Sequence, residues 1–153
     1  MHGAVTLHMR AEPGRVWDLV SDVTRIGSYS PETFEAEWLE GATGPQLGAR
    51  FRGHVKRNGR GPVYWTECKV VSCEPGREFG FVVLLRDKPV NTWTYKMEAS
   101  GDGTDVTESF RMQPTTFNRI YWAIAGKARN RTNVAGMRQT LERIRVAVES
   151  EPS

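Results

Sequence analysis

The feature that most constrains the fold is a long series of alternating strands closed by one amphipathic helix. The series begins at residues 4–10, and the last element carries Met137, Leu141, Ile144 and Val148 at steps of four, three and four. Those steps follow one face of an α-helix. A curved antiparallel sheet with one apolar face needs a covering layer, and a single long helix often leaves a cavity beneath it. The sequence therefore predicts a pocket before it indicates any chemistry.

The strand pattern predicts which side chains face the covering helix. Apolar and polar residues alternate through most of the chain, as half-buried strands require. Turn sequences such as Glu74-Pro-Gly-Arg77 separate the strands, so we expect an antiparallel meander. The residues expected to face inward are Val5, Leu7, Met9, Phe34, Ala36, Trp38, Phe51, Gly53, Val55, Trp93, Tyr95, Met97, Val106, Glu108 and Phe110.

The orientation of residues 63–73 stays open. Trp65 and Val71 share one parity, whereas Cys68 and Val70 share the other, so a bulge at an undetermined position would reconcile them. The five-residue separation of Cys68 and Cys73 puts the two thiols on opposite faces of a regular strand, which argues against a disulfide.

Composition and motifs narrow the class of protein. The 153 residues predict a single domain, residues 1–153, with ordinary apolar content of 39% and a net charge of +3. The longest apolar run, residues 79–85, is too short to span a bilayer, and no secretory signal opens the chain, so we expect a cytoplasmic protein. Cys-x-x-Cys, His-Glu-x-x-His, Gly-x-Ser-x-Gly and phosphate-loop motifs do not occur, so we expect no metal and no cofactor.

Glu108 is the candidate catalytic residue. Its parity places the carboxyl on the inward face, where an unpaired charge costs several kcal/mol and must be partnered, hydrated or protonated. A protonated glutamate in a pocket can serve as a general acid or base. The alternatives are a salt bridge near the strand end and a bulge that turns Glu108 outward.

The stripe of the last helix becomes polar and small toward its start. Traced backwards from Met137, it passes through Asn133 or Val134, then Asn130, then roughly Gly126. A helix face that packs against a solid core should stay apolar. Either asparagine can face a ligand or solvent, and the phase of the stripe leaves both readings open.

Aromatic residues are expected to line one wall of the pocket, although each can equally be ordinary core. Tyr29 ends the second short helix, close to the expected entrance. The predicted ligand-binding set is Tyr29, Phe51, Phe81, Trp93, Tyr95, Glu108, Asn130, Asn133 and Met137.

The chain resembles the SRPBCC superfamily of START-like and Bet v 1-like proteins, and within it the polyketide cyclase/dehydrase group. The stretches that carry the resemblance are 13–22 (Pro-Gly-Arg-Val-Trp-Asp-Leu-Val-Ser-Asp), 48–53 (Gly-Ala-Arg-Phe-Arg-Gly), 74–77 (Glu-Pro-Gly-Arg), 93–95 (Trp-Thr-Tyr), 103–108 (Gly-Thr-Asp-Val-Thr-Glu) and 140–144 (Thr-Leu-Glu-Arg-Ile). The resemblance implies an α+β helix-grip fold, in which a seven-stranded antiparallel sheet wraps a long C-terminal helix and two short helices follow the first strand. It also implies an apolar ligand between sheet and helix.

Three functions remain open at this level. The leading hypothesis is binding of a small hydrophobic molecule, lipid-like or polyketide-like, in a cavity of about 300–1,000 Å³. The second is a cyclase or dehydratase-type enzyme in which Glu108 moves the proton, aided by Tyr95 or Asn130. The third is an interaction module that uses the basic outer face around Arg50–Lys56. The expected partner is a small ligand, with no nucleic acid and no integral membrane association, and the protein is expected to be a monomer or a homodimer.

Overall fold

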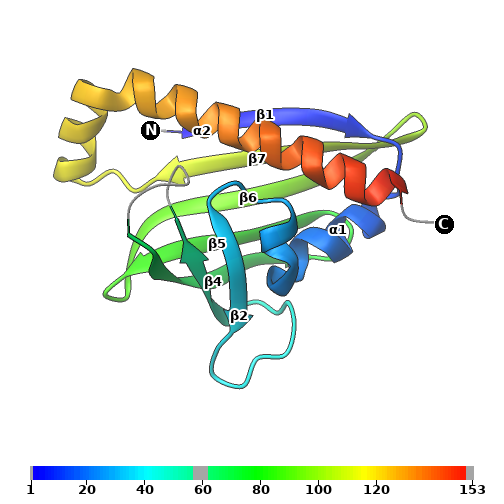
Figure 1. Ribbon diagram of the computed structural model, residues 1–153, viewed down its shortest axis with the longest axis horizontal. Coiled ribbons are helices and arrows are strands. Elements are labelled where there is room, and N and C mark those ends of the chain that lie inside the picture. The colour runs from blue at the N-terminus through cyan, green and yellow to red at the C-terminus, as the bar shows by residue number, and fades with distance from the viewer. Residues whose placement is uncertain (1, 57–61, 151–153) are drawn as a thin grey trace.

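The computed structural model describes residues 2–56 and 62–150. In chain order these residues form β1 (His2–Met9), α1 (Pro13–Ser21), the 3-10 helix η1 (Val23–Ser28), β2 (Thr33–Trp38), β3 (Arg50–Val55), β4 (Tyr64–Glu74), β5 (Glu78–Leu85), β6 (Lys88–Ser100), β7 (Gly103–Met112) and α2 (Thr116–Ser150). The strands form one seven-stranded sheet in the order β1-β7-β6-β5-β4-β3-β2 (Figure 1). All six pairings are antiparallel, so the predicted α+β helix-grip fold is confirmed.

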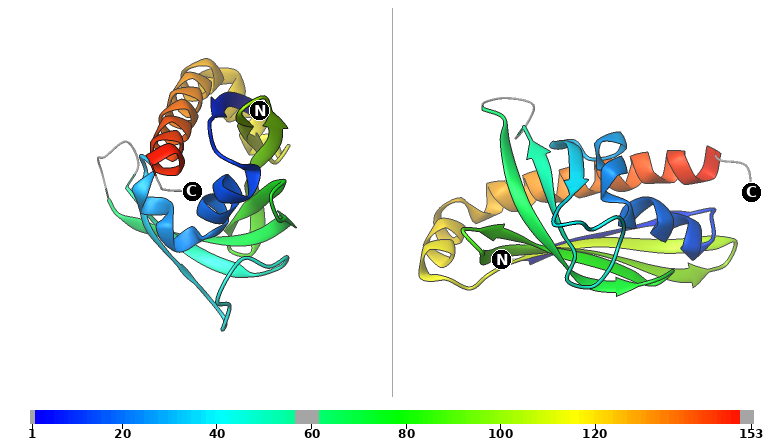
Figure 2. Two further views of the ribbon diagram at one scale, coloured as in Figure 1. Left: turned by 90° about the vertical axis from the view of Figure 1, so that its right-hand side faces the viewer. Right: turned by 90° about the horizontal axis from the view of Figure 1, so that it is seen from below.

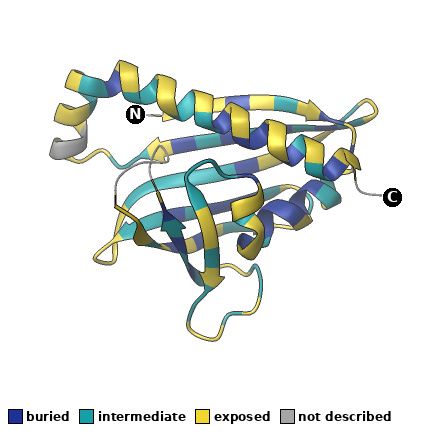
Figure 3. Cartoon of the chain, viewed as in Figure 1, coloured by how far each residue is buried: buried dark blue, intermediate teal, exposed yellow. Residues whose placement is uncertain are grey.

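Helix α2 covers the concave side of the sheet, and α1 and η1 fill the space beside it (Figure 2). The predicted stripe of α2 lies in the core, because Met137, Leu141, Ile144 and Val148 are each at most 2% exposed. Buried residues gather along the sheet side of the second half of α2, whereas its first turns are mostly exposed (Figure 3). The core is therefore solid under the C-terminal half of α2.

The inward assignment of the strands is confirmed with one exception. Phe34 was expected to face inward, but 47% of it is exposed and its ring lies 4.4 Å from the ring of His54. The register of β2 against β3 shifts between Thr33 and Glu35, which is the signature of a bulge. The bulge breaks the alternation, so parity assigns Phe34 to the wrong face.

A second bulge settles the orientation of β4. The β4–β5 register shifts between Val70 and Ser72, so Cys68 and Val70 are buried while Val71 is 46% exposed. Beyond the bulge, Cys73 packs against the core as Cys68 does. The expectation that the two cysteines face opposite sides is therefore wrong, because the extra residue changes the parity. None of the described helices is both long enough and apolar enough to cross a membrane.

Candidate ligand-binding cavity

A cavity of about 190 Å³ lies between the sheet and α2. Its walls come from strands β3 to β7, from the connection between η1 and β2, and from residues 129–140 of α2. This volume is below the expected range, because aromatic side chains fill much of the space. Among them, the rings of Phe51 and Phe81 meet edge to face at 5.1 Å.

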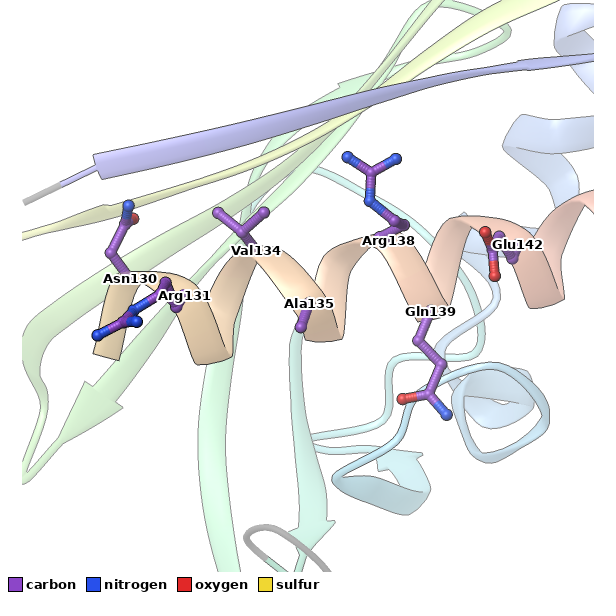
Figure 4. A pocket seen from close by; sticks show the side chains of 7 residues that line it. All are labelled: Asn130, Arg131, Val134, Ala135, Arg138, Gln139 and Glu142. Atoms are coloured by element: carbon purple, nitrogen blue, oxygen red, sulfur yellow. The ribbon is translucent and has the colours of Figure 1, made fainter. Parts of the chain in front are cut away.

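Seven of the nine predicted binding residues line this cavity: Phe51, Phe81, Trp93, Tyr95, Glu108, Asn133 and Met137. Tyr29 is only 2% exposed and belongs to the core instead of the lining. Asn130 is absent from the cavity lining, because its side chain points toward β1 (Figure 4), where its Oδ1 is buried without a hydrogen-bond partner among the described residues. The structure therefore brings most of the set together around one space and separates the two asparagines.

The Glu108 carboxyl is buried in the cavity wall, with 5% of the residue exposed. Burial raises the pKa of Glu108 to about 8, and a side-chain hydrogen bond from Tyr95, its cross-strand neighbour, partly opposes that rise. Burial also raises the pKa of Tyr29 and of Tyr95, and the nearby charge of Glu108 is the second-largest cause of both shifts. All three groups therefore hold their protons at neutral pH, and Glu108 is mainly a carboxylic acid.

Two buried polar atoms on the cavity wall have no hydrogen-bond partner among the described residues. They are Oε1 of Glu108 and Oδ1 of Asn91. Asn91 lies four residues before Tyr95 on β6, so the Cα atoms of these two residues are about 13 Å apart at the usual rise of a strand. Tyr95 is the cross-strand neighbour of Glu108, so the two unpartnered atoms lie at separate places on the wall. Each buried atom left without a partner costs about 1–3 kcal/mol, so both favour a bound molecule that supplies one.

A family model described as "Polyketide cyclase / dehydrase and lipid transport" matches residues 2–149. The chain belongs to this family. The match agrees with the resemblance to the SRPBCC superfamily that the sequence motifs carry.

Solved structures support the same assignment. The Polyketide_cyc-like protein Cgl2372 from Corynebacterium glutamicum is 30% identical, with 97% of this chain and 91% of that one covered at a TM-score of 0.65. TTHA0849 from Thermus thermophilus is 16% identical, with coverage of 99% and 100% at a TM-score of 0.71. The di-domain ARO/CYC BexL from the BE-7585A biosynthetic pathway is 20% identical, with coverage of 99% of this chain and 51% of BexL at a TM-score of 0.72. The last two likenesses show the fold alone. No curated protein matches this chain.

Sequence reasoning missed several lining residues of this polyketide cyclase/dehydrase family member. Asn91 shares the inward parity of Trp93 and Tyr95, so extending the alternation of β6 by one step would have found it. Arg129 and Thr132 line the cavity one helical turn before Asn133 and Gly136. Because Arg129 and Thr132 are polar, they do not belong to the apolar pattern by which the buried face of the helix was predicted.

The basic outer face of β3 is largely paired with carboxylates. Arg50 lies 3.0 Å from Asp87, Arg52 is bonded to Glu37, and Nδ1 of His54 lies 2.7 Å from Glu35. The Arg52 guanidinium also sits 4.1 Å above the Trp65 ring. Two further basic residues that follow this strand in the sequence, Arg57 and Arg60, lie outside the described residues. This face is therefore close to neutral where the structure describes it.

A larger hollow of about 500 Å³ follows the outside of α2 (Figure 4). All of its lining residues come from α2 itself: Asn130, Arg131, Val134, Ala135, Arg138, Gln139 and Glu142. No second element encloses it, so the smaller cavity under α2 is the better candidate site. Within the described residues, no cluster of three or more histidine, cysteine or acidic side chains can hold a metal.

Proposed function

We propose that this protein binds one small, largely apolar molecule that carries a hydrogen-bond acceptor, in the cavity between the sheet and α2. The proposal rests on Glu108 Oε1, a buried polar atom on the cavity wall without a protein partner. Because the carboxyl is mainly protonated, it can donate to a ligand carbonyl or hydroxyl oxygen. The aromatic wall would hold the apolar part, and Asn91 would meet a second polar group.

A cyclase or dehydratase-type reaction is the second candidate, and the raised pKa of Glu108 favours it. In a cyclisation, an enol carbon would attack a ketone carbon and form the ring bond. Glu108 would give its proton to the ketone oxygen and regain one from the enol. BexL, named as an ARO/CYC, shares the fold and makes this chemistry worth testing. The paired basic face of β3 supports no such argument for an interaction module.

Two probes of nearly equal shape test the binding proposal. We expect 2-acetylnaphthalene, which has a carbonyl oxygen, to bind about tenfold more tightly than 2-isopropenylnaphthalene, which has a methylene group there. Glu108→Leu should abolish the preference, whereas Glu108→Gln, which keeps a donor, should retain it. Titration calorimetry below pH 8, where Glu108 holds its proton, measures both affinities.

Glu98→Leu is the matched control, because Glu98 is an exposed carboxylate on β6. It should leave both affinities unchanged. The binding proposal fails if Glu108→Leu keeps the carbonyl preference. It also fails if neither probe binds and native mass spectrometry detects no co-purified molecule. Turnover of a poly-β-ketone that disappears in Glu108→Gln would identify an enzyme, while binding without turnover would identify a carrier.

A further inference from the structure

The first turns of α2 carry exposed apolar side chains. These turns lie at the edge of the molecule, beyond the end of the neighbouring strands, and run in a different direction from the rest of α2 (Figure 1 and Figure 2). We call residues 116–131 the overhanging segment. Within it, Ile120 is 56% exposed, Tyr121 37% and Ile124 83%. Large apolar residues this exposed, close together on one helix, indicate a contact surface.

One face of the overhanging segment combines these isoleucines with positive charge. Ile120, Ile124, Lys127 and Arg131 follow one another at steps of four, three and four, so they form a single stripe. On the opposite side, Gly126 is buried and Trp122 packs against Phe110 with ring centroids 6.2 Å apart. The inner side is therefore anchored, and the outer stripe is free to contact a partner.

The charge of the segment has one sign. Residues 116–131 contain no Asp or Glu, and their basic residues are Arg119, Lys127, Arg129 and Arg131. None of these four makes an ion pair with a described residue. The contrast with β3 is plain, because the arginines there are held by carboxylates. The overhanging segment thus presents uncompensated positive charge around an apolar centre.

We propose that the overhanging segment docks on the surface of an anionic lipid bilayer. Ile120 and Ile124 would enter the boundary between headgroups and acyl chains, and Lys127 and Arg131 would lie among the phosphates, as in interfacial amphipathic helices. A symmetric dimer through this face would bring its own cations together. Nucleic acid would leave the two isoleucines without an apolar partner. An anionic bilayer offers an apolar environment to the two isoleucines and phosphate groups to the two cations, so it matches both parts of the face.

The position of the segment connects this surface with the cavity. Arg129, Thr132 and Asn133 line the cavity and directly follow the exposed isoleucines along α2. A docked segment would therefore hold the α2 wall of the cavity close to the bilayer. Docking itself requires no ligand, so it can be tested independently of the proposed binding function.

Vesicle flotation tests the docking proposal. The full chain should float with vesicles of phosphatidylcholine containing about one-third phosphatidylglycerol, and much less with phosphatidylcholine alone, because anionic lipid supplies the attraction. Added salt should weaken the binding. The double variant Lys127→Gln/Arg131→Gln should lower the partition coefficient about 25-fold, at roughly fivefold for each charge. Ile124→Glu should lower it about tenfold or more.

Two matched controls sit on the second half of the same helix. Val146 is 65% exposed, and Arg143 is exposed. Val146→Glu and Arg143→Gln should leave vesicle binding unchanged. Circular dichroism and binding of 2-acetylnaphthalene would show that every variant keeps its fold and cavity. The proposal is overturned if wild type stays unbound, if Ile124→Glu floats like wild type, or if Ile124→Glu instead dissociates a dimer in sedimentation equilibrium.

Discussion

Replacing Glu108 with glutamine is expected to remove most of the pH dependence of stability between pH 4.5 and about 8. In the unfolded chain the carboxyl loses its proton near the ordinary value of 4.5, whereas the folded protein keeps it up to about pH 8. Between these values the folded state holds one more proton. Raising the pH therefore lowers the free energy of unfolding, by about 1.4 kcal/mol per pH unit.

Glu108 makes stability fall as the pH rises, because the pKa of its carboxyl is higher in the folded state than in the unfolded chain. The stabilising contribution of Glu108 to the free energy of unfolding is fully present below pH 4.5, where the carboxyl is protonated in both states. It is lost once the pH passes about 8. The total change is on the order of 4–5 kcal/mol, a large part of the stability of a small domain. Tyr29 and Tyr95 keep their protons throughout, because burial raises the pKa of both hydroxyls. Neither tyrosine therefore adds to the slope.

His8 provides the control for this measurement. Its neighbours Asp105 and Asp102 raise the pKa of His8 above 6.5, so its contribution is also lost as the pH rises. The His8 ring is exposed, however, and exposed pairs contribute little. Urea unfolding should show a shallow pH profile for Glu108→Gln and a near wild-type profile for His8→Gln. If Glu108→Gln keeps the wild-type slope, Glu108 is not the buried neutral acid.

The fold follows from two repeating patterns, which explains why sequence could predict it. Period-two alternation identified the sheet, and the stripe from Met137 to Val148 identified the covering helix. Both patterns arise because one face of each element is buried. The spacing of the buried residues is then fixed by the geometry of a regular strand or helix. A bulge adds one residue without changing composition. Phe34 and Cys73 were therefore misplaced, because Phe34 lies at one register shift and Cys73 follows another, and no residue type marks either position.

The site was predictable only where it continued a regular pattern. Trp93, Tyr95 and Glu108 line the cavity because their parity is inward and uninterrupted. Asn130 and Asn133 both suited the backward trace of the α2 stripe, and only the packing of the helix decides that Asn133 meets the cavity. Helical phase carries an uncertainty of about one residue where no apolar side chain fixes it.

Gly27→Ala is expected to cause the largest loss of stability among single changes around the cavity. Gly27 lies in η1, and a Cβ added there would sit 2.1 Å from the carbonyl oxygen of Phe34 on β2. The obstacle is backbone, so no side chain can rotate away. We expect the free energy of unfolding to fall by about 3 kcal/mol or more. Urea unfolding of the variant measures this loss.

Gly14→Ala provides the matched control, because a Cβ at that position meets nothing within 4 Å. Gly14 lies in α1, so alanine there should stabilise the protein by up to about 1 kcal/mol. Equal stabilities of the two variants would contradict the close packing of η1 against β2. Ile26 and residues 30–33 line the cavity on either side of this contact. Gly27→Ala should therefore also weaken binding of 2-acetylnaphthalene, whereas Gly14→Ala should not, because only the first substitution displaces a cavity wall.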